Sequence, residues 1–142
     1  MKIRSFDIHK AAGIIIVERK ILVTREKGES IFVSPGGTVK NGESPKETVI
    51  RELKEEVGIS VRSLNLKEFG VYYAEASNDI GKFLKMEVFN VVSWEGEPAP
   101  SAGEEIIEEI LWLDSKIPSG IKVGSIFAHE VIPRLKEYNL ID

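Results

Sequence analysis

Apolar residues occur along this chain in short runs that polar and turn-forming residues interrupt. Runs rich in isoleucine, valine, leucine and aromatic residues predict β-strands when glycine, proline, asparagine or charged residues bound them. Glu18, Arg19 and Lys20 separate the first two runs, which therefore predict a hairpin. The predicted strands cover residues 11–17, 21–24, 31–33, 61–66, 69–75, 83–94 and 106–113.

Apolar residues at every fourth position predict two helices. The first follows Ser44, which can cap a helix, and begins with Pro45, which suits the first helical position; Glu47 completes a capping box. Gly58 is the usual left-handed residue after a last turn, so the helix is predicted to end there. The apolar stripe that packs on the sheet comprises Val49, Leu53 and Val57.

The second helix is predicted over residues 125–138. Pro133 lies inside it, so we expect a kink or a break there. A mixed sheet with two principal helices makes an α/β layered domain the predicted fold class. The apolar stripe of this second helix comprises Phe127, Val131 and Leu135.

Composition is that of an ordinary globular domain and excludes several kinds of function. The 142 residues suit one domain over residues 1–142, with 42% hydrophobic and 30% charged residues. A net charge of -4 argues against general nucleic-acid binding, which needs an excess of lysine and arginine. The absence of cysteine excludes disulfides, zinc thiolate sites and thiol nucleophiles. Neither a signal peptide nor a bilayer-spanning segment is predicted, and a cytoplasmic location is the default expectation.

Three carboxylates crowd one face of the first predicted helix. Glu52, Glu55 and Glu56 lie within an arc of roughly 100°, because an α-helix advances about 100° per residue. Like charges at this spacing repel by about 0.2–0.5 kcal/mol per pair, and a solvated helix gains nothing from them. A helix that binds a divalent cation does gain, since hard cations take carboxylate, carbonyl and phosphate oxygens as ligands. Arg51 is four residues from both Glu47 and Glu55, so it can hold a carboxylate in position.

A glycine turn precedes this helix. Gly36 and Gly37 let the backbone approach a ligand closely, because glycine has no side chain. A free carbonyl in this turn can supply one more oxygen ligand to a cation. Asn41 and Gly42 are a second turn signal, which brings Glu43 to the entrance of the helix.

Residues 37–59 resemble the Nudix box, a pattern of glycines, glutamates, one arginine and aliphatic residues at fixed spacing. Outside the box, a strand that leads to Arg25, followed by Phe32 and the glycine turn, is similar to the usual approach in that family. Glu105, Glu108 and Trp112 resemble the segment that often closes the site. The resemblance implies a Nudix-type α/β/α sandwich with a mixed β-sheet. Every defined position of the box is filled here, by Gly37, Glu43, Arg51, Glu52, Leu53, Glu55, Glu56, Gly58 and Ile59.

This resemblance implies a hydrolase that depends on Mg²⁺ or Mn²⁺ and cleaves the diphosphate linkage of a nucleoside diphosphate derivative. Either Glu52 or Glu55 is often assigned as the catalytic base in the family, and the box alone does not decide between them. Some members instead use a loop carboxylate, for which the candidates here are Glu104, Glu105 and Glu108. The implied metal ligands are Glu52, Glu55, Glu56 and the Gly36 carbonyl.

The other residues implied for the reaction surround this metal site. Arg51 and Glu43 are expected to orient and brace the catalytic helix rather than to touch substrate. A surface ion pair with Glu26 or Glu29 is an equal alternative for Arg25, and core packing is the alternative for Phe32. The implied substrate-binding residues are Arg25, Phe32, Gly37 and Glu105.

The compactness of the chain favours a nucleoside triphosphate pyrophosphohydrolase that resembles the MutT group of the family. An ADP-ribose or nucleotide-sugar pyrophosphatase is the main enzymatic alternative. A non-catalytic nucleotide-binding module is an alternative from another class, and RNA-end processing is a third, against which the acidic balance argues. The expected partner is a small-molecule nucleotide, without a membrane or an extended nucleic acid, and a homodimer stays open.

Overall fold

The computed structural model describes residues 5–76, 81–101 and 106–142. Its helical segments are α1 (Pro45–Val57), η1 (Ser63–Asn65), η2 (Phe127–Val131) and α2 (Ile132–Glu137). Its strands are β1 (Ile8–Ile14), β2 (Ile16–Val17), β3 (Lys20–Glu26), β4 (Ile31–Phe32), β5 (Gly36–Thr38), β6 (Leu66–Glu75), β7 (Phe83–Val91), β8 (Ile107–Leu113) and β9 (Lys122–Val123).

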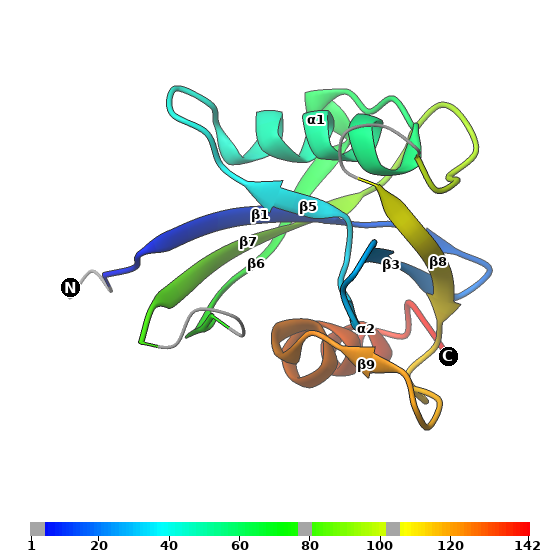
Figure 1. The fold of residues 1–142 in the computed structure, drawn as a ribbon. Coiled ribbons are helices and arrows are strands. Elements are labelled where there is room, and N and C mark those ends of the chain that lie inside the picture. Colours follow the sequence, from blue (N-terminus) through cyan, green and yellow to red (C-terminus); the bar gives the residue numbers. More distant parts are fainter. Residues whose placement is uncertain (1–4, 77–80, 102–105) are drawn as a thin grey trace.

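The strands form a mixed four-stranded sheet and two smaller sheets. The large sheet has the order β5-β1-β7-β6, in which β1 and β7 are parallel and the other neighbours antiparallel. A three-stranded sheet has the order β2-β3-β8, and β4 pairs with β9. Figure 1 shows α1 above the large sheet and the C-terminal helix, formed by η2 and α2, below it. The prediction of a mixed sheet between two principal helices is therefore confirmed.

Local sequence fixes both ends of α1. The Ser44 side chain accepts a hydrogen bond from the Glu47 amide, and the Glu47 side chain accepts one from the Ser44 amide, which is the predicted capping box. Gly58 ends the helix with a left-handed φ of 71°. The missing side chain of Gly13 on β1 lets α1 pack closely, because a Cβ there would lie 3.0 Å from a methyl of Val49. The apolar stripe of α1 is fully buried, as predicted, at Val49, Leu53 and Val57.

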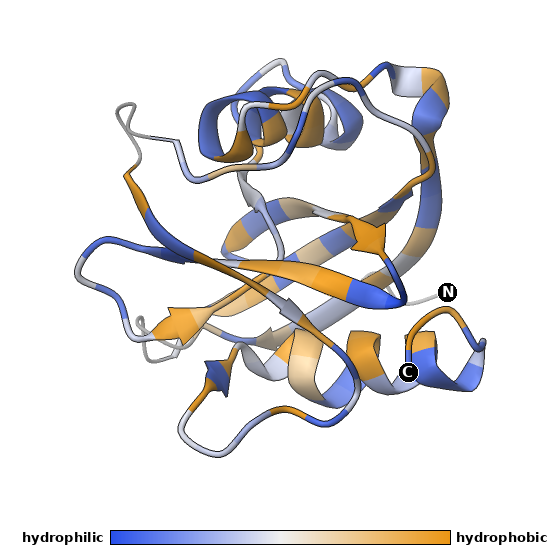
Figure 2. Cartoon of the chain, turned by 90° about the vertical axis from the view of Figure 1, so that its right-hand side faces the viewer, coloured by the Kyte–Doolittle hydropathy of each residue, from blue (hydrophilic) through white to orange (hydrophobic). Residues whose placement is uncertain are grey.

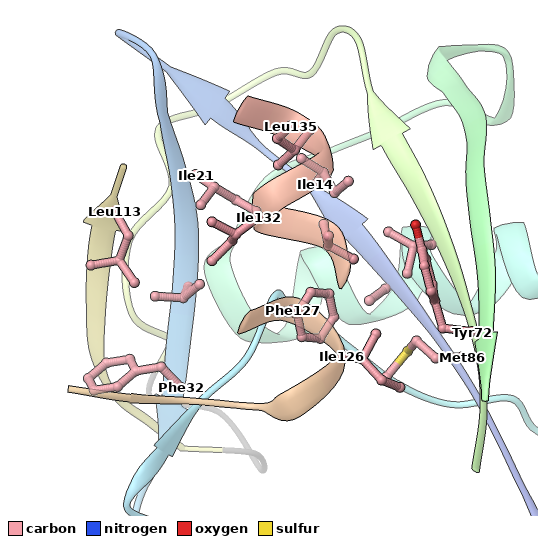
Figure 3. Close-up of a cluster of buried hydrophobic side chains, with 14 of the residues drawn as sticks. Ile14, Ile21, Phe32, Tyr72, Met86, Leu113, Ile126, Phe127, Ile132 and Leu135 are labelled. Atoms are coloured by element: carbon pink, nitrogen blue, oxygen red, sulfur yellow. The ribbon is translucent and has the colours of Figure 1, made fainter. Parts of the chain in front are cut away.

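A second core lies between the large sheet and the C-terminal helix. In Figure 3, Phe127 lies at the centre of this cluster, with Tyr72 and Met86 of the sheet beside it. The kink predicted from Pro133 takes the form of a π turn over η2, in which the Ile132 amide donates to the Phe127 carbonyl. Proline has no amide hydrogen to continue the regular helical ladder, and a π turn is a common accommodation. The predicted stripe of this helix is buried at Phe127, Val131 and Leu135.

Three details of the chain trace differ from the sequence prediction. Residues 61–66 were expected as a strand, but residues 63–65 form the short helix η1, and within this range only Leu66 belongs to a strand, as the first residue of β6. The glycine turn at residues 36–37 is instead part of strand β5, which pairs with β1. Strand β9 was not predicted, since two residues carry no periodic signal. Pairing with distant segments, rather than local preference, determines the strands β5 and β9.

Figure 2 shows apolar positions gathered along the strands and on the inner sides of the helices, with polar positions at the loops. Within the described ranges, no helix combines the length and the apolar character that crossing a membrane requires.

Candidate functional site

The outer edge of β5 brings backbone polar groups next to α1. Ala11 of β1 pairs with Gly37, and on one side of this pair the Gly13 amide donates to the Pro35 carbonyl. Gly36 lies between these points, so its amide and carbonyl face away from β1, as alternate residues of an antiparallel edge strand do. Its amide donates to Oε2 of Glu56 at 3.0 Å. The Gly36 carbonyl therefore lies on the edge that α1 approaches.

Gly37 makes room for the carboxyl group of Glu52. A Cβ placed on Gly37 would lie 2.7 Å from Cδ of Glu52 and 2.8 Å from its Oε2. Ordinary contacts between carbon atoms are about 3.5–4.0 Å, so no other residue fits here without moving Glu52. The second glycine of the pair is therefore a packing requirement of this carboxylate.

Two of the three carboxylates on the acidic face of α1 are buried, which is costly for charged groups unless they are paired. Glu52 and Glu56 are each 2% exposed. Glu56 accepts the Gly36 amide, and Oε1 of Glu52 accepts from Arg51. Oε2 of Glu52 is buried and has no hydrogen-bond partner among the residues that the structure describes. This orphaned carboxylate oxygen is an available ligand position.

Arg51 organises the charged groups around the helix entrance. Its guanidinium donates to both carboxylate oxygens of Glu43, at 2.8 and 3.0 Å, and to the Thr38 carbonyl at 3.2 Å. It also contacts Glu52, and Glu55 at 3.5 Å. One arginine thus ties β5, the loop before α1 and the acidic face together, and its bracing role in the reaction stays a prediction.

Glu43 is the most strongly stabilised carboxylate of this network. The hydrogen bond from Arg51 lowers the pKa of Glu43 to about 2, with further contributions from Thr48 and the Lys40 amide. The Thr48 hydroxyl donates to Glu43 at 2.6 Å. In return, Glu43 raises the pKa of the Arg51 guanidinium. The pair stays charged throughout the physiological range.

The donor set suits a hard divalent cation. Buried Glu52 with an orphaned oxygen, buried Glu56 and the outward-facing Gly36 carbonyl offer only oxygen ligands. Glu55 differs from its neighbours, because its side chain is 47% exposed. Within the described part of the chain, no three acidic or histidine side chains already converge as a metal cage. The residues thus fit a cation that is completed by water or substrate oxygens, as Mg²⁺ usually is.

Two adjoining cavities lie beside this edge. The first, of about 180 Å³, is lined by Gly36, Gly37 and Glu56, together with Lys10, Glu26 and Ser34 among others. The second, of about 100 Å³, is largely apolar and lies between the large sheet and the start of the C-terminal helix. Both cavities are lined by Lys10, Val33 and Met86.

A larger hollow of about 500 Å³ lies elsewhere, between β2, β8 and the loop after β7. Trp94 and Trp112 line it, and none of the box carboxylates does. The chemistry of the acidic face therefore belongs to the smaller cavities rather than to this hollow.

The predicted substrate-binding residues have different surroundings. Arg25 lies over the ring of Phe32, pairs with Glu109 at 3.3 Å and Glu108 at 3.7 Å, and donates a hydrogen bond to the Glu29 carbonyl at 3.1 Å. Phe32 is 4% exposed and belongs to the second core, which agrees with the core-packing alternative. A substrate contact for Arg25 stays a prediction. Glu104 and Glu105 lie outside the described residues.

Lys10 and Met86 are cavity residues that the sequence did not indicate. Lys10 lies just before the strand predicted over residues 11–17, and Met86 lies within the strand predicted over residues 83–94, so neither carried a signal of its own. Only the register, in which these two residues are direct neighbours across β1 and β7, places them on one wall.

Comparison with known proteins gives a consistent match. Residues 7–125 match the NUDIX domain family. The 8-oxo-dGTP diphosphatase of Escherichia coli is 33% identical over 99 residues, which cover 66% of this chain and 73% of that protein. The ADP-ribose pyrophosphatase of Methanocaldococcus jannaschii is 41% identical over 63 residues, which cover 42% of this chain and 36% of that protein.

Among solved structures, a MutT NUDIX hydrolase from Burkholderia pseudomallei superposes with a TM-score of 0.70. The alignment covers 92% of this chain and 95% of that chain, at 19% sequence identity. At this identity the likeness concerns the fold, which matches the layered arrangement described above.

Proposed function

This chain belongs to the Nudix hydrolase family, and from that premise we propose that it is a metal-dependent nucleoside triphosphate pyrophosphohydrolase. The two curated relatives described above act on nucleotide phosphoanhydrides. The observation that carries the proposal is the pair of buried carboxylates, Glu52 and Glu56, at the glycine edge of β5. Both carboxyl groups lie at the edge that carries the outward-facing Gly36 carbonyl, and Oε2 of Glu52 has no hydrogen-bond partner among the described residues. Oxygen-rich coordination of a divalent cation accounts for their position.

We propose that Mg²⁺, or Mn²⁺, is held by Glu52, Glu56 and the Gly36 carbonyl. Glu55 lies on the solvent-exposed side of this metal site. A cation bound there would polarise a phosphoryl oxygen and lower the pKa of a coordinated water. Arg51 holds Glu52 in place, and Glu43 holds Arg51. The side chains of this network thus fix the ligands before substrate arrives, which is the usual way a site lowers its reorganisation cost.

Glu55 is the carboxylate that we assign to accept the proton from attacking water. Its side chain is 47% exposed, whereas that of Glu52 is 3% exposed and accepts a hydrogen bond from Arg51. A general base must reach water within hydrogen-bonding distance. Exposure therefore favours Glu55 over Glu52 for this role.

The second cavity suits the nucleoside base of the substrate. Met86, Leu84, Ile126 and Phe127 give it an apolar wall, and Figure 3 shows Ile126 and Met86 beside each other. Flat bases bind well between apolar and aromatic side chains. The base would then lie beyond the wall of Lys10, Val33 and Met86 that the two cavities share, and the phosphates would reach the glycine edge of β5.

A triphosphate substrate is supported by the Escherichia coli diphosphatase, which aligns over most of its length. Hydrolysis of ADP-ribose is the second candidate, because the Methanocaldococcus jannaschii pyrophosphatase is more identical over a shorter segment. The non-catalytic alternative is weaker, since every glutamate of the box is present in this chain.

A hydrolysis panel tests the proposal. It contains normal and oxidised nucleoside triphosphates, ADP-ribose, nucleotide sugars and dinucleoside polyphosphates, each with Mg²⁺ and with Mn²⁺. We expect the highest kcat/KM on a triphosphate, and a loss of at least about 100-fold in kcat for Glu52→Gln and Glu55→Gln. Glu68→Gln is the matched control, because Glu68 is exposed on β6, away from the box.

Three results would change the assignment. A higher kcat/KM on ADP-ribose would select the second candidate. Nucleotide binding without turnover of any compound would select the non-catalytic module. Full activity of Glu52→Gln would contradict the proposed metal site.

A further inference from the structure

Lys10 occupies the point where the two cavities meet. It lines both of them, as do Val33 and Met86. The register across the large sheet places Lys10 directly between Thr38 of β5 and Met86 of β7. Residues paired in this way point to the same face of a sheet, so the three side chains form one row.

This row connects the glycine edge to the apolar cavity. Thr38 is two residues from Gly36, whose amide binds Glu56. Two strand residues span about 7 Å, so the Lys10 row lies one short step from the carboxylates. On its other side, Met86 and Ile126 begin the apolar wall.

Charge makes Lys10 distinctive among the residues that line the two cavities. Among the described residues that line the two cavities, Lys10 is the one basic residue. The other charged residues of these walls are the glutamates Glu26, Glu56 and Glu75. Lys10 is half-buried and forms no ion pair with any described residue, whereas Arg25 of β3 is paired with Glu108 and Glu109. A half-buried ammonium without a carboxylate partner is a ready donor to an anion.

The wall of the first cavity carries a further unsatisfied group. Ser34 is 2% exposed, and its hydroxyl has no hydrogen-bond partner among the described residues. Buried polar groups are nearly always hydrogen-bonded, so an unpaired hydroxyl beside a cavity indicates a polar occupant. This observation is independent of the position of Lys10.

We propose that Lys10 binds the phosphate that is attached to the nucleoside, and so positions the substrate with its base in the second cavity and its outer phosphates at the glycine edge. The proposal rests on the proposed function, because it takes the substrate to be a nucleotide. Three ammonium donors suit a tetrahedral phosphate, which offers acceptors only. Lys10 is then the residue that distinguishes a nucleotide from a nucleoside.

Isothermal titration calorimetry tests this assignment on the intact protein. The probes are dGMP and AMP, with deoxyguanosine and adenosine as the matched compounds that lack phosphate. We expect Lys10→Met to weaken monophosphate binding by about tenfold to a hundredfold, the range for a charged hydrogen bond, and to leave nucleoside binding unchanged. Lys10→Arg keeps the charge and is expected to stay within about threefold of the wild type.

Lys67→Met on exposed β6 removes a lysine outside both cavities and is expected to change nothing. Thermal unfolding of each variant verifies the fold, and Lys10→Gln replaces Lys10→Met if the latter unfolds. In steady-state kinetics, we expect Lys10→Met to raise KM at least tenfold while kcat changes less than about threefold, the pattern of lost binding.

Several results would overturn the assignment. Equal weakening of nucleoside and monophosphate would mean that Lys10 only shapes the cavity, and unchanged monophosphate binding would remove its role altogether. Failure of both monophosphates to bind the wild type would also overturn it. These outcomes are separate from the proposed function, which fails when the wild type hydrolyses no nucleotide, whatever Lys10→Met does to monophosphate binding.

Discussion

A single added methyl group at Gly37 provides a sharp perturbation of the site. Gly37→Ala removes no titratable group from the chain and reduces only the space beside Glu52. The new Cβ would lie 2.7 Å from Cδ of Glu52 and 2.8 Å from Oε2. Because ordinary contacts are about 3.5–4.0 Å, the carboxyl group must retreat by about 1 Å.

This displacement has two expected consequences. Overpacking of a buried position costs about 1–3 kcal/mol of unfolding free energy. A misplacement of about 1 Å in a reacting constellation can cost about 100-fold in rate. We therefore expect kcat of Gly37→Ala to fall by about 100-fold, while the protein remains folded.

Gly42→Ala is the matched control. Gly42 has a φ of 79° and nothing within 4 Å of an added Cβ, so alanine there is strained by roughly 1 kcal/mol without touching the site. Steady-state hydrolysis and thermal unfolding are measured for both variants. We expect the control to lose stability yet keep kcat within about twofold. Wild-type kcat in Gly37→Ala would refute the claim that this glycine seats a catalytic carboxylate.

Two further predictions concern the support of the helix. Ser44→Ala removes the capping interaction with Glu47 and is expected to lower the free energy of unfolding by about 1 kcal/mol, measured by thermal unfolding. The control Ser63→Ala on η1 is expected to lower it much less. Equal losses in the two variants would contradict the capping role. The pKa of Glu43 is lowered to about 2 by Arg51, so its stabilisation is complete above about pH 4.5 and is lost as pH falls toward 2. Glu43→Gln should therefore flatten the dependence of unfolding free energy on pH in that window, by about 1–2 kcal/mol in total after solvent screening, and an unchanged slope would contradict the ion pair.

The bounds of α1 were predictable because its signals are local. Ser44 and Glu47 satisfy one end through side chains only three residues apart, and Gly58 allows the left-handed turn at the other. The stripe of Val49, Leu53 and Val57 follows directly from the helical period, and all three are buried. The Nudix box lies mostly on this one helix, which is why the reaction class was also predictable from sequence.

Features that depend on pairing between distant segments were not predictable. Two glycines have a low preference for strands, yet Gly36 and Gly37 form β5 because β1 offers its free edge. The position of Lys10 between two cavities likewise depends on the registers of β5, β1 and β7. Sequence spacing does not distinguish the three carboxylates on the acidic face of α1, and only packing separates buried Glu52 and Glu56 from exposed Glu55.

Metal binding by the free protein tests the central claim most directly. Electron paramagnetic resonance can follow Mn²⁺ titrated into the wild type, Glu52→Gln and the control Glu68→Gln. If the orphaned oxygen of Glu52 is a metal ligand, the wild type and the control bind Mn²⁺ alike, and Glu52→Gln binds at least about tenfold more weakly. Equal affinity in Glu52→Gln and the wild type would contradict a metal site at the glycine edge of β5.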